Sequence, residues 1–373
     1  MKVVVAVDSF KGSMTSLEAG KAIKQGILDA KPDSTVVIKP LADGGEGTAD
    51  VLIEGLQGER IEVVVKGPYG KSVKGHYGYW EKTNTVVIEM ASAAGIVLSE
   101  ERDVMSATTY GVGEMILDAL KRGGKHFIIG LGGSATNDGG IGMLQALGFE
   151  FLDEEGRNVG EGGQALHKIE TILCNNKNPL LKDTSFQVAC DVKNPLCGKN
   201  GATCVYGPQK GVTEEMWEKL DEAMCHYAEI TEKEFGCNYK DQEGAGAAGG
   251  LGFAFLAYLN AELKSGSELI LDAVDIDQDL KDADIVVTGE GRLDGQTAMG
   301  KAPIGVARRA KKYGGKVIAF AGAVTADAAL CNGAGIDAFF PIVRGVTTLE
   351  DAMDTENAKK SMRASVEQVF RLL

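Results

Sequence analysis

The sequence has little of what disulfide-linked and metal-centred proteins depend on. Its seven cysteines are odd in number and scattered, with no C-x-x-C pair and no zinc-type spacing to histidine. The four histidines form no H-E-x-x-H motif. These absences argue against a disulfide framework and a transition-metal site, and they predict reduced thiols in a cytoplasmic protein.

The sequence also lacks a membrane segment and an excess of positive charge. Asp8 interrupts the first apolar run and no small-residue cleavage site follows it, so no signal peptide is predicted. The uncharged stretch 244–261 begins with glycine and alanine, which favours a buried helix over a membrane span. The 39 Lys and Arg against 53 Asp and Glu give a net charge of −14, which disfavours nucleic acid as a partner.

Buried strands alternate with helices at both ends of the chain. "KVVVAVD" (2–8) and "STVVIKPLA" (34–42) are typical of strands buried on both faces, and each is followed by a loop and a helical pattern. The same rhythm returns in "DIVVTGEG" (284–291), "KVIAFAGAV" (316–324) and "DAFFPIV" (337–343). These five strands predict a flavodoxin-like, doubly wound parallel sheet built from both chain ends.

The middle of the chain follows another pattern. Residues 60–91 contain strands broken by short turns, which predicts an antiparallel meander. Further strands are expected at 126–133 and 185–192, with helices between them. We therefore predict an α/β protein of two domains, with residues 1–64 and 283–373 forming the flavodoxin-like domain and 65–282 an inserted mixed α/β domain. The strand within 105–148 fits either sheet.

Four loops rich in glycine and charge follow predicted strands. They read "DSFKGS" (8–13), "LADGGEGT" (41–48), "GLGGSATNDGG" (130–140) and "TGEGRLDGQTAMGKAP" (288–303). Ligands of open parallel sheets bind beyond the carboxyl ends of the strands, where such loops lie. Bare backbone beside charged side chains predicts a site for a small anionic ligand.

Residues 295–301 spell G-x-x-x-x-G-K, but Ala302 stands where a P-loop has Ser or Thr. "GEGRLD" also separates the predicted strand from this motif, so a standard P-loop is not expected. A phosphate site of another design is consistent with Arg292, Lys301 and a helix that begins near Pro303. The alternative is a glycine-rich turn with solvated basic side chains.

A second motif favours a different ligand. Gly130, Gly132 and Ala135 fit the dinucleotide fingerprint G-x-G-x-x-A, and Glu150 lies where a ribose-binding acid is expected. "SATNDGG" nevertheless continues as a loop where the fingerprint requires a helix.

Taken together, the motifs resemble those of the type-1, bacterial glycerate kinase family. The resemblance rests on "VAVDSFKGSMTS" (5–16), "PLADGGEGT" (40–48), "GLGGSATNDGG" (130–140), "DVKNPLCGKNGA" (191–202) and "TGEGRLDGQTAMGKAP" (288–303), in family order along the chain. It implies transfer of the ATP γ-phosphoryl group to D-glycerate with Mg²⁺, by a cytoplasmic kinase whose partners are glycerate and ATP. The family favours 2-phosphoglycerate as the product, and it has two α/β domains.

The chemistry of phosphoryl transfer suggests roles for individual residues. Catalysis is assigned to Lys11, Arg292 and a carboxylate that orients the attacking hydroxyl, with Asp191 the first choice and Asp8 the second. Mg²⁺ prefers hard oxygen ligands, for which the candidates are Asp43, Glu46 and Glu290. Substrate and phosphate binding is assigned to Ser9, Lys301, Gly289, Gly291, Gly295, Thr297, Gly132, Gly133, Ser134, Asn137 and Asp138.

Two alternative functions stay open at this point. An NAD-dependent hydroxy-acid dehydrogenase would use the motif at 130–135 for its dinucleotide. A non-catalytic sensor would bind nucleotide and a small acid without turnover.

Overall fold

The computed structural model describes residues 1–42, 44 and 47–373 of the chain. The predicted ligands Asp43 and Glu46 lie outside the described residues. Compact packing divides the chain into two units, which are described separately. The first unit comprises Met1–Asp43, Glu54–Gln57 and Ser267–Leu373, and the second comprises Gly44–Ile53 and Gly58–Gly266.

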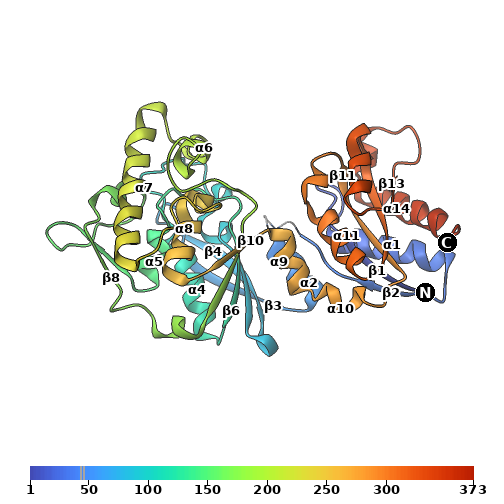
Figure 1. Cartoon of the computed structure of the whole chain (residues 1–373), viewed down its shortest axis with the longest axis horizontal. Coiled ribbons are helices and arrows are strands. Elements are labelled where there is room, and N and C mark those ends of the chain that lie inside the picture. Colours follow the sequence, from blue (N-terminus) through green and yellow to red (C-terminus); the bar gives the residue numbers. More distant parts are fainter. Residues whose placement is uncertain (43, 45–46) are drawn as a thin grey trace. The chain divides into compact units, whose positions relative to one another are not determined.

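The first unit is built on a parallel sheet whose strands come from both chain ends (Figure 1). Its order is β13 (Ala338–Pro341), β12 (Lys316–Val324), β11 (Ile285–Leu293), β1 (Lys2–Val7), β2 (Thr35–Ile38). β1 pairs with both β2 and β11, and Val7 is in register with Gly289. This is the 2-1-3-4-5 order of flavodoxin-like sheets, and the predicted fold class is confirmed.

Helices cover both faces of this sheet. α1 (Ser16–Ala30) and α14 (Thr355–Phe370) pack over the alternate residues Val3, Val5 and Val7. α11 (Ala302–Lys312) packs against β1, β11 and β12. The remaining helices of the unit are α9 (Gly266–Ala273), α10 (Ile276–Leu280), α12 (Leu330–Gly333) and α13 (Leu349–Met353).

The second unit has a mixed six-stranded sheet. Its order is β10 (Glu262–Lys264), β9 (Ser185–Ala189), β6 (His126–Gly130), β5 (Thr85–Glu89), β4 (Ser72–Trp80), β3 (Glu59–Lys66). β3, β4 and β5 form the predicted antiparallel meander, whereas β5, β6, β9 and β10 are parallel. The strand within 105–148 is β6, which lies in the middle of this sheet. A separate antiparallel pair joins β7 (Glu150–Leu152) to β8 (Thr171–Leu173).

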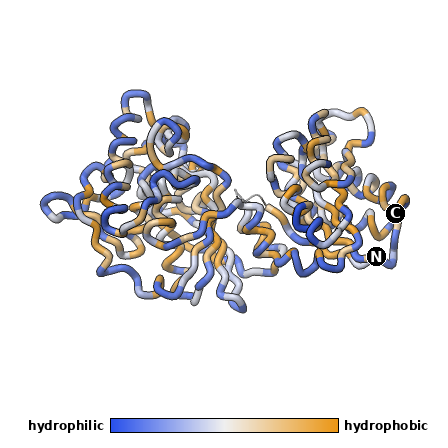
Figure 2. The backbone as a smooth tube through the Cα atoms, viewed as in Figure 1, coloured by the Kyte–Doolittle hydropathy of each residue, from blue (hydrophilic) through white to orange (hydrophobic). Residues whose placement is uncertain are grey.

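The helices of the second unit surround a large apolar core. They are α3 (Ala91–Ala94), α4 (Tyr110–Lys121), α5 (Ile141–Ala146), α6 (Ala202–Tyr206), α7 (Glu214–Phe235) and α8 (Ala247–Leu259), and α2 (Thr48–Leu56) begins in this unit. In each unit the hydrophobic residues are concentrated in the central strands (Figure 2), and buried apolar side chains of the surrounding helices pack against them. The uncharged stretch 244–261 contains the whole of α8, whose residues Ala247 and Leu251 are buried, so a core helix is found there as predicted.

The units differ from the predicted domains at 44–53 and 58–64, which belong to the second unit, and at 267–282, which belong to the first. Residues 59–64 lie in β3, which pairs along its length with β4 and therefore belongs to the second unit. Residues 267–282 form α9 and α10, which join the first unit because Arg309 of α11 binds Asp272 and Asp277. Apolar patterning could not assign such short amphipathic helices to one sheet or the other.

Candidate active site

The first candidate cluster lies at the carboxyl ends of β1 and β11, where the strand order of the parallel sheet reverses. Open α/β sheets bind their ligands at such points. Asp8 follows β1 directly, and its backbone N–H donates to the Gly289 carbonyl over 2.8 Å. Its side chain is only 8% exposed, and Oδ1 accepts the Ser9 N–H at 2.7 Å. Asp8 therefore shapes the turn that leaves the strand.

Lys11 lies at the tip of a tight loop. Phe10 and Met14 exchange two backbone hydrogen bonds, of 2.8 and 3.0 Å, and both side chains are buried in the core of the unit. Gly12, with φ +78°, provides the left-handed conformation that closes the turn. This geometry anchors the loop on both sides of Lys11, which is itself exposed.

The two predicted loops of this unit lie side by side. A Cβ added to Gly291 would be 3.5 Å from the Phe10 Cα and 3.6 Å from the Lys11 nitrogen. A Cβ on Gly289 would be 2.0 Å from the Phe320 carbonyl oxygen, so this position requires glycine. The chain segments 8–14 and 288–303, far apart in sequence, thus meet at one edge of the sheet.

A hydrogen-bonded group of carboxylates lies within segment 288–303. Thr297 Oγ1 donates to Glu290 Oε1 at 2.7 Å, and Asp294 Oδ1 accepts the backbone N–H groups of Gln296 and Thr297 at 3.0 and 3.1 Å. Lys301 Nζ lies 3.9 Å from Glu290 Oε2 and 3.8 Å from Asp294 Oδ1. Burial raises the pKa of Glu290, and the Thr297 hydrogen bond and the Lys301 charge oppose that rise.

Arg292 differs from these residues in its exposure. Its side chain is 66% exposed, and its Nε lies 3.6 Å from Asp294 Oδ2. The guanidinium group is thus oriented by a neighbouring carboxylate while most of it faces solvent. The sequence analysis did not select Asp294, although D-x-x-T followed by a glycine-rich turn is a signal for such a loop.

The near-match to a P-loop is not a P-loop in the structure. β11 extends to Leu293, two residues beyond the predicted strand, so "GEGRL" belongs to the strand instead of separating it from the motif. A 3₁₀ turn at Thr297–Met299 then precedes α11, and Gly295 packs against Asp327. Lys301 is the residue before the helix, and no side chain caps α11, so the N–H groups of its first turn have no side-chain partner.

The second candidate cluster lies at the carboxyl ends of β5, β6 and β9 in the other unit. Loop 131–140 follows β6, and its Gly132 and Gly133 are exposed while Ser134 is buried. Gly133 adopts φ +73°, and its carbonyl accepts the Ile96 N–H at 2.8 Å. The loop is thus held at the Gly133 carbonyl, while the two glycines, which have no side chains, expose their backbone to solvent.

Asp138 and Asn137 are wholly buried within this loop. Asp138 Oδ2 accepts the N–H and the hydroxyl of Thr109, both at 2.8 Å, and Oδ1 accepts the Gly140 N–H at 3.0 Å. Asn137 Nδ2 donates to Thr203 Oγ1 at 3.0 Å. Burial raises the pKa of Asp138, and these donors act against that rise. Both residues were predicted to bind substrate, but their burial makes them supports of the loop instead.

Asp138→Asn is expected to lower the free energy of unfolding by about 3 kcal/mol, because the amide would set an N–H group against donors. Chemical denaturation followed by circular dichroism and fluorescence measures the loss. The exposed Asp183→Asn is the control and should change nothing. Equal stability of the two variants would contradict the structural role of Asp138.

Asp191 lies on the loop after β9 and is exposed. Its Oδ1 accepts the Gly266 N–H at 3.1 Å. Glu89, at the end of β5, was not predicted. It is buried and accepts the N–H groups of Gly47 and Ala49 at 3.1 and 2.7 Å, so it binds the start of α2.

The structure does not support the dinucleotide alternative. The helix that the fingerprint requires directly after Gly130–Ala135 is absent, and α5 begins only at Ile141. Glu150 lies in β7, which belongs to the separate two-stranded sheet. Gly139 and Gly140 of this loop instead serve close packing, since a Cβ on Gly140 would be 2.5 Å from the Ala254 Cβ.

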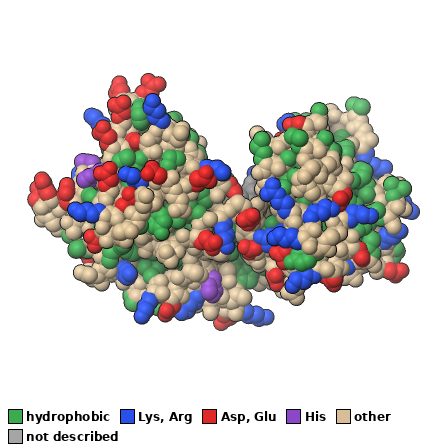
Figure 3. Space-filling view, in the orientation of Figure 1, with side chains coloured by type: hydrophobic (Ala, Val, Ile, Leu, Met, Phe, Trp, Pro, Cys, Tyr) green, Lys and Arg blue, Asp and Glu red, His purple; other side chains and the backbone are tan. Residues whose placement is uncertain are grey.

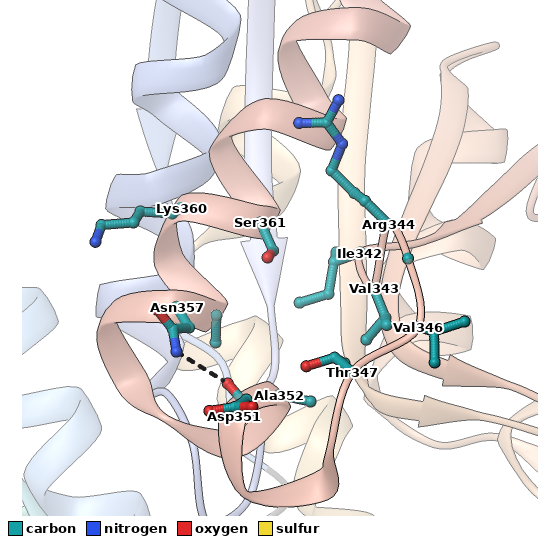
Figure 4. A pocket seen from close by; sticks show the side chains of 12 residues that line it. Ile342, Val343, Arg344, Val346, Thr347, Asp351, Ala352, Asn357, Lys360 and Ser361 are labelled. Atoms are coloured by element: carbon teal, nitrogen blue, oxygen red, sulfur yellow. Dashed lines mark hydrogen bonds between the residues drawn. The ribbon is translucent and has the colours of Figure 1, made fainter.

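A small cavity of about 300 Å³ lies between residues 342–347 and the start of α14 in the first unit (Figure 4). The side chains of Thr347 and Ser361 point into it, whereas Lys360 points away. None of the predicted site residues lines it.

Charged side chains of both signs are interspersed over the face shown in Figure 3, without a continuous basic surface. Among the described residues, no group of three or more His, Cys, Asp or Glu is placed to hold a metal ion. No helix in the described parts of the chain combines the length and apolar character that crossing a membrane requires.

Comparison with known proteins agrees with the predicted fold and family. The model of the glycerate kinase family matches residues 3–373. The chain is 48% identical to a glycerate kinase of Bacillus subtilis, over 95% of this chain and 93% of the relative. It is 46% identical to a protein named glycerate 2-kinase from Escherichia coli, over 94% and 93%.

A solved structure gives the same result. A Salmonella typhimurium protein assigned as glycerate kinase 2 superposes with a TM-score of 0.91 and 43% identity, covering 100% of this chain and 98% of that one. The class defined by these findings is that of kinases, phosphotransferases with an alcohol group as acceptor. The chain belongs to the glycerate kinase family. The predicted family and enzyme class are confirmed, and membership implies the use of ATP and glycerate.

Proposed function

We propose that the chain transfers the γ-phosphoryl group of ATP to the C2 hydroxyl of D-glycerate, giving 2-phosphoglycerate and ADP. The observation that carries this proposal is the meeting of loops 8–14 and 288–303 at the switch point of the parallel sheet, with Lys11, Arg292 and Lys301 in the two loops. The E. coli relative named glycerate 2-kinase supports the choice of the C2 hydroxyl.

In the first unit, basic side chains offset the negative charge of the substrates. Lys301 and the N–H groups at the start of α11 bind phosphate oxygens, because a helix begins there without a side-chain cap. Arg292 grips a carboxylate or phosphate in bidentate fashion. Lys11 reaches the transferred phosphoryl group and stabilises the charge that develops on it. Ser9, held by Asp8, and the close-packed Gly289, Gly291 and Gly295 fix the backbone around them.

Two carboxylates beside the Thr297 hydroxyl supply hard oxygens of the kind that Mg²⁺ binds. Glu290 presents a largely buried carboxylate with one oxygen bound by Thr297, and Asp294 lies on the other side of the same hydroxyl. Such hard ligands suit the ion, so we assign Glu290 to its binding, while Asp43 and Glu46 are candidate ligands from the sequence alone. When bound, Mg²⁺ would neutralise charge on the phosphate oxygens.

In the second unit, the exposed peptide units of Gly132 and Gly133 bind phosphate oxygens of ATP, with Ser134 fixing the strand-like exit of the loop. Asp191 acts as the carboxylate that orients the attacking hydroxyl. The hydroxyl oxygen attacks the γ-phosphorus, the bond from that phosphorus to the β,γ-bridging oxygen breaks, and the hydroxyl proton passes to Asp191. ADP leaves with the electrons of the broken bond.

The product tests this proposal directly. Incubation with ATP, Mg²⁺ and D-glycerate is expected to give one new phosphomonoester resonance in phosphorus NMR, coupled to the single proton at C2. A resonance coupled to the two protons at C3 would identify 3-phosphoglycerate and overturn the choice of hydroxyl. L-glycerate under the same conditions is the control for stereochemistry, and we expect no product from it.

A further inference from the structure

Lys210 is the one basic side chain that is buried among the described residues. It is 1% exposed and ends the 3₁₀ turn Pro208–Lys210, in the second unit. Burying an ammonium group is unfavourable unless it is paired and hydrogen-bonded. An apolar side chain of similar length would fill the space more favourably, so packing alone does not explain a lysine in this position.

The ammonium group of Lys210 binds loop 131–140, which we propose to bind the phosphate groups of ATP. Lys210 Nζ donates to Ser134 Oγ at 2.8 Å and to the Thr136 carbonyl at 2.7 Å. Both partners follow Gly132 and Gly133 closely in the chain. Since the two hydrogen bonds hold a side chain and a carbonyl of one loop, they fix its backbone at two points.

The segment that carries Lys210 is itself rigid. The Lys210 N–H donates to the Gly207 carbonyl at 2.8 Å, and Gly211 closes the turn with φ +101°. Thr203, four residues before Gly207, accepts the Asn137 amide at 3.0 Å. Segment 203–211 thus holds loop 131–140 at Ser134, Thr136 and Asn137.

We propose that Lys210 is a positioning residue for phosphoryl transfer, which holds the peptide units of Gly132 and Gly133 in the conformation that binds the triphosphate of ATP. This inference rests on the proposed phosphate-binding role of loop 131–140. Lys210 does not itself touch the substrate, because its side chain is buried and its ammonium group is bound to Ser134 and Thr136.

The charge of Lys210 adds a pH dependence. Burial lowers its pKa to about 7, and the opposite charge of Asp138 limits the shift. Asp138 is the titratable group that acts on Lys210, and Ser134, Thr136 and Asn137 are neutral. The ammonium group is therefore lost as the pH rises through neutrality, and the loop loses a positive charge behind its phosphate-binding face. We expect ATP binding to weaken over that range.

The test is steady-state kinetics of Lys210→Met from pH 6 to 9. The KM for ATP should rise at least about tenfold at pH 6.5, while the KM for glycerate stays within about twofold. The wild-type rise of KM for ATP with pH should be flatter in the variant. Lys210→Arg should restore part of the affinity, and the exposed Lys219→Met, on α7, is the matched control.

Two further variants test the Lys210 contact and the phosphate-binding role of the loop separately. Ser134→Ala removes one acceptor with little change of volume, so it serves if Lys210→Met does not fold, and a KM for ATP within about twofold of wild type would then overturn the proposal. Gly132→Val tests the loop itself. If Gly132→Val weakens ATP binding but Lys210→Met does not, the role of Lys210 is wrong. If neither does, the proposed role of the loop fails together with it.

Discussion

Lys11→Met is expected to fold normally and to lose at least about a thousandfold in kcat, the scale of effect found when a transition-state charge partner is removed. The side chain lies at the tip of a loop that Phe10 and Met14 anchor in the core, so its removal leaves the packing intact. Methionine keeps the length of the side chain and removes only the positive charge. Coupled measurement of ADP release gives the rate, and a melting curve gives the stability.

The matched control for this experiment is Lys24→Met, an exposed lysine on the helix that follows the same loop. It should behave as wild type in both measurements. Substantial turnover in Lys11→Met would remove Lys11 from the site. A melting temperature far below wild type would instead make Lys11 a structural residue, because the fold would then depend on its side chain.

Arg292→Ala is expected to lower kcat/KM for glycerate phosphorylation by at least about a hundredfold. The guanidinium group is oriented by Asp294 and is otherwise exposed, so it is available for bidentate contact with an anion. Arg292→Lys should recover only part of the loss, since an ammonium group cannot form the planar pair of hydrogen bonds. Initial rates at varied glycerate and ATP show which substrate depends on it.

Arg308→Ala provides the comparison, because Arg308 is an exposed arginine on α11. Its rate should equal that of wild type. A rate for Arg292→Ala within about threefold of this control would place Arg292 outside the site.

The sequence was sufficient for the fold because its strands carry strong local signals. Continuous β-branched runs such as residues 2–8 are typical of strands buried on both faces, and β1 occupies that position in the sheet. Boundaries were harder to predict. The predicted strand ended at Gly291, but the pairing of β11 with β12 continues to Leu293.

The site could be predicted only where residues are adjacent in the chain. The loops at 8–13 and 288–303 were identified by glycine and charge, and the parallel sheet brings them together. Lys210 and Glu89 were missed because their roles depend on contacts across long sequence separations. A single lysine in "YGPQKGV" gives no sign that its ammonium group is buried against a loop some 75 residues earlier, as the separations of 76 and 74 residues show.

The pairing of β1 with β11 has a consequence for biosynthesis. These strands are separated by 282 residues at the register Val3 with Ile285, so β1 meets this partner only after most of the chain has been made, although β2 is available to it early. The sheet of the second unit needs no residue beyond Lys264, and it can form while translation continues. Such non-local pairing is the slow kind, because a long loop must close before any contact is gained. The nascent chain therefore completes early the sheet that carries loop 131–140, whereas the loops that carry Lys11 and Arg292 come together only after β11 has been made.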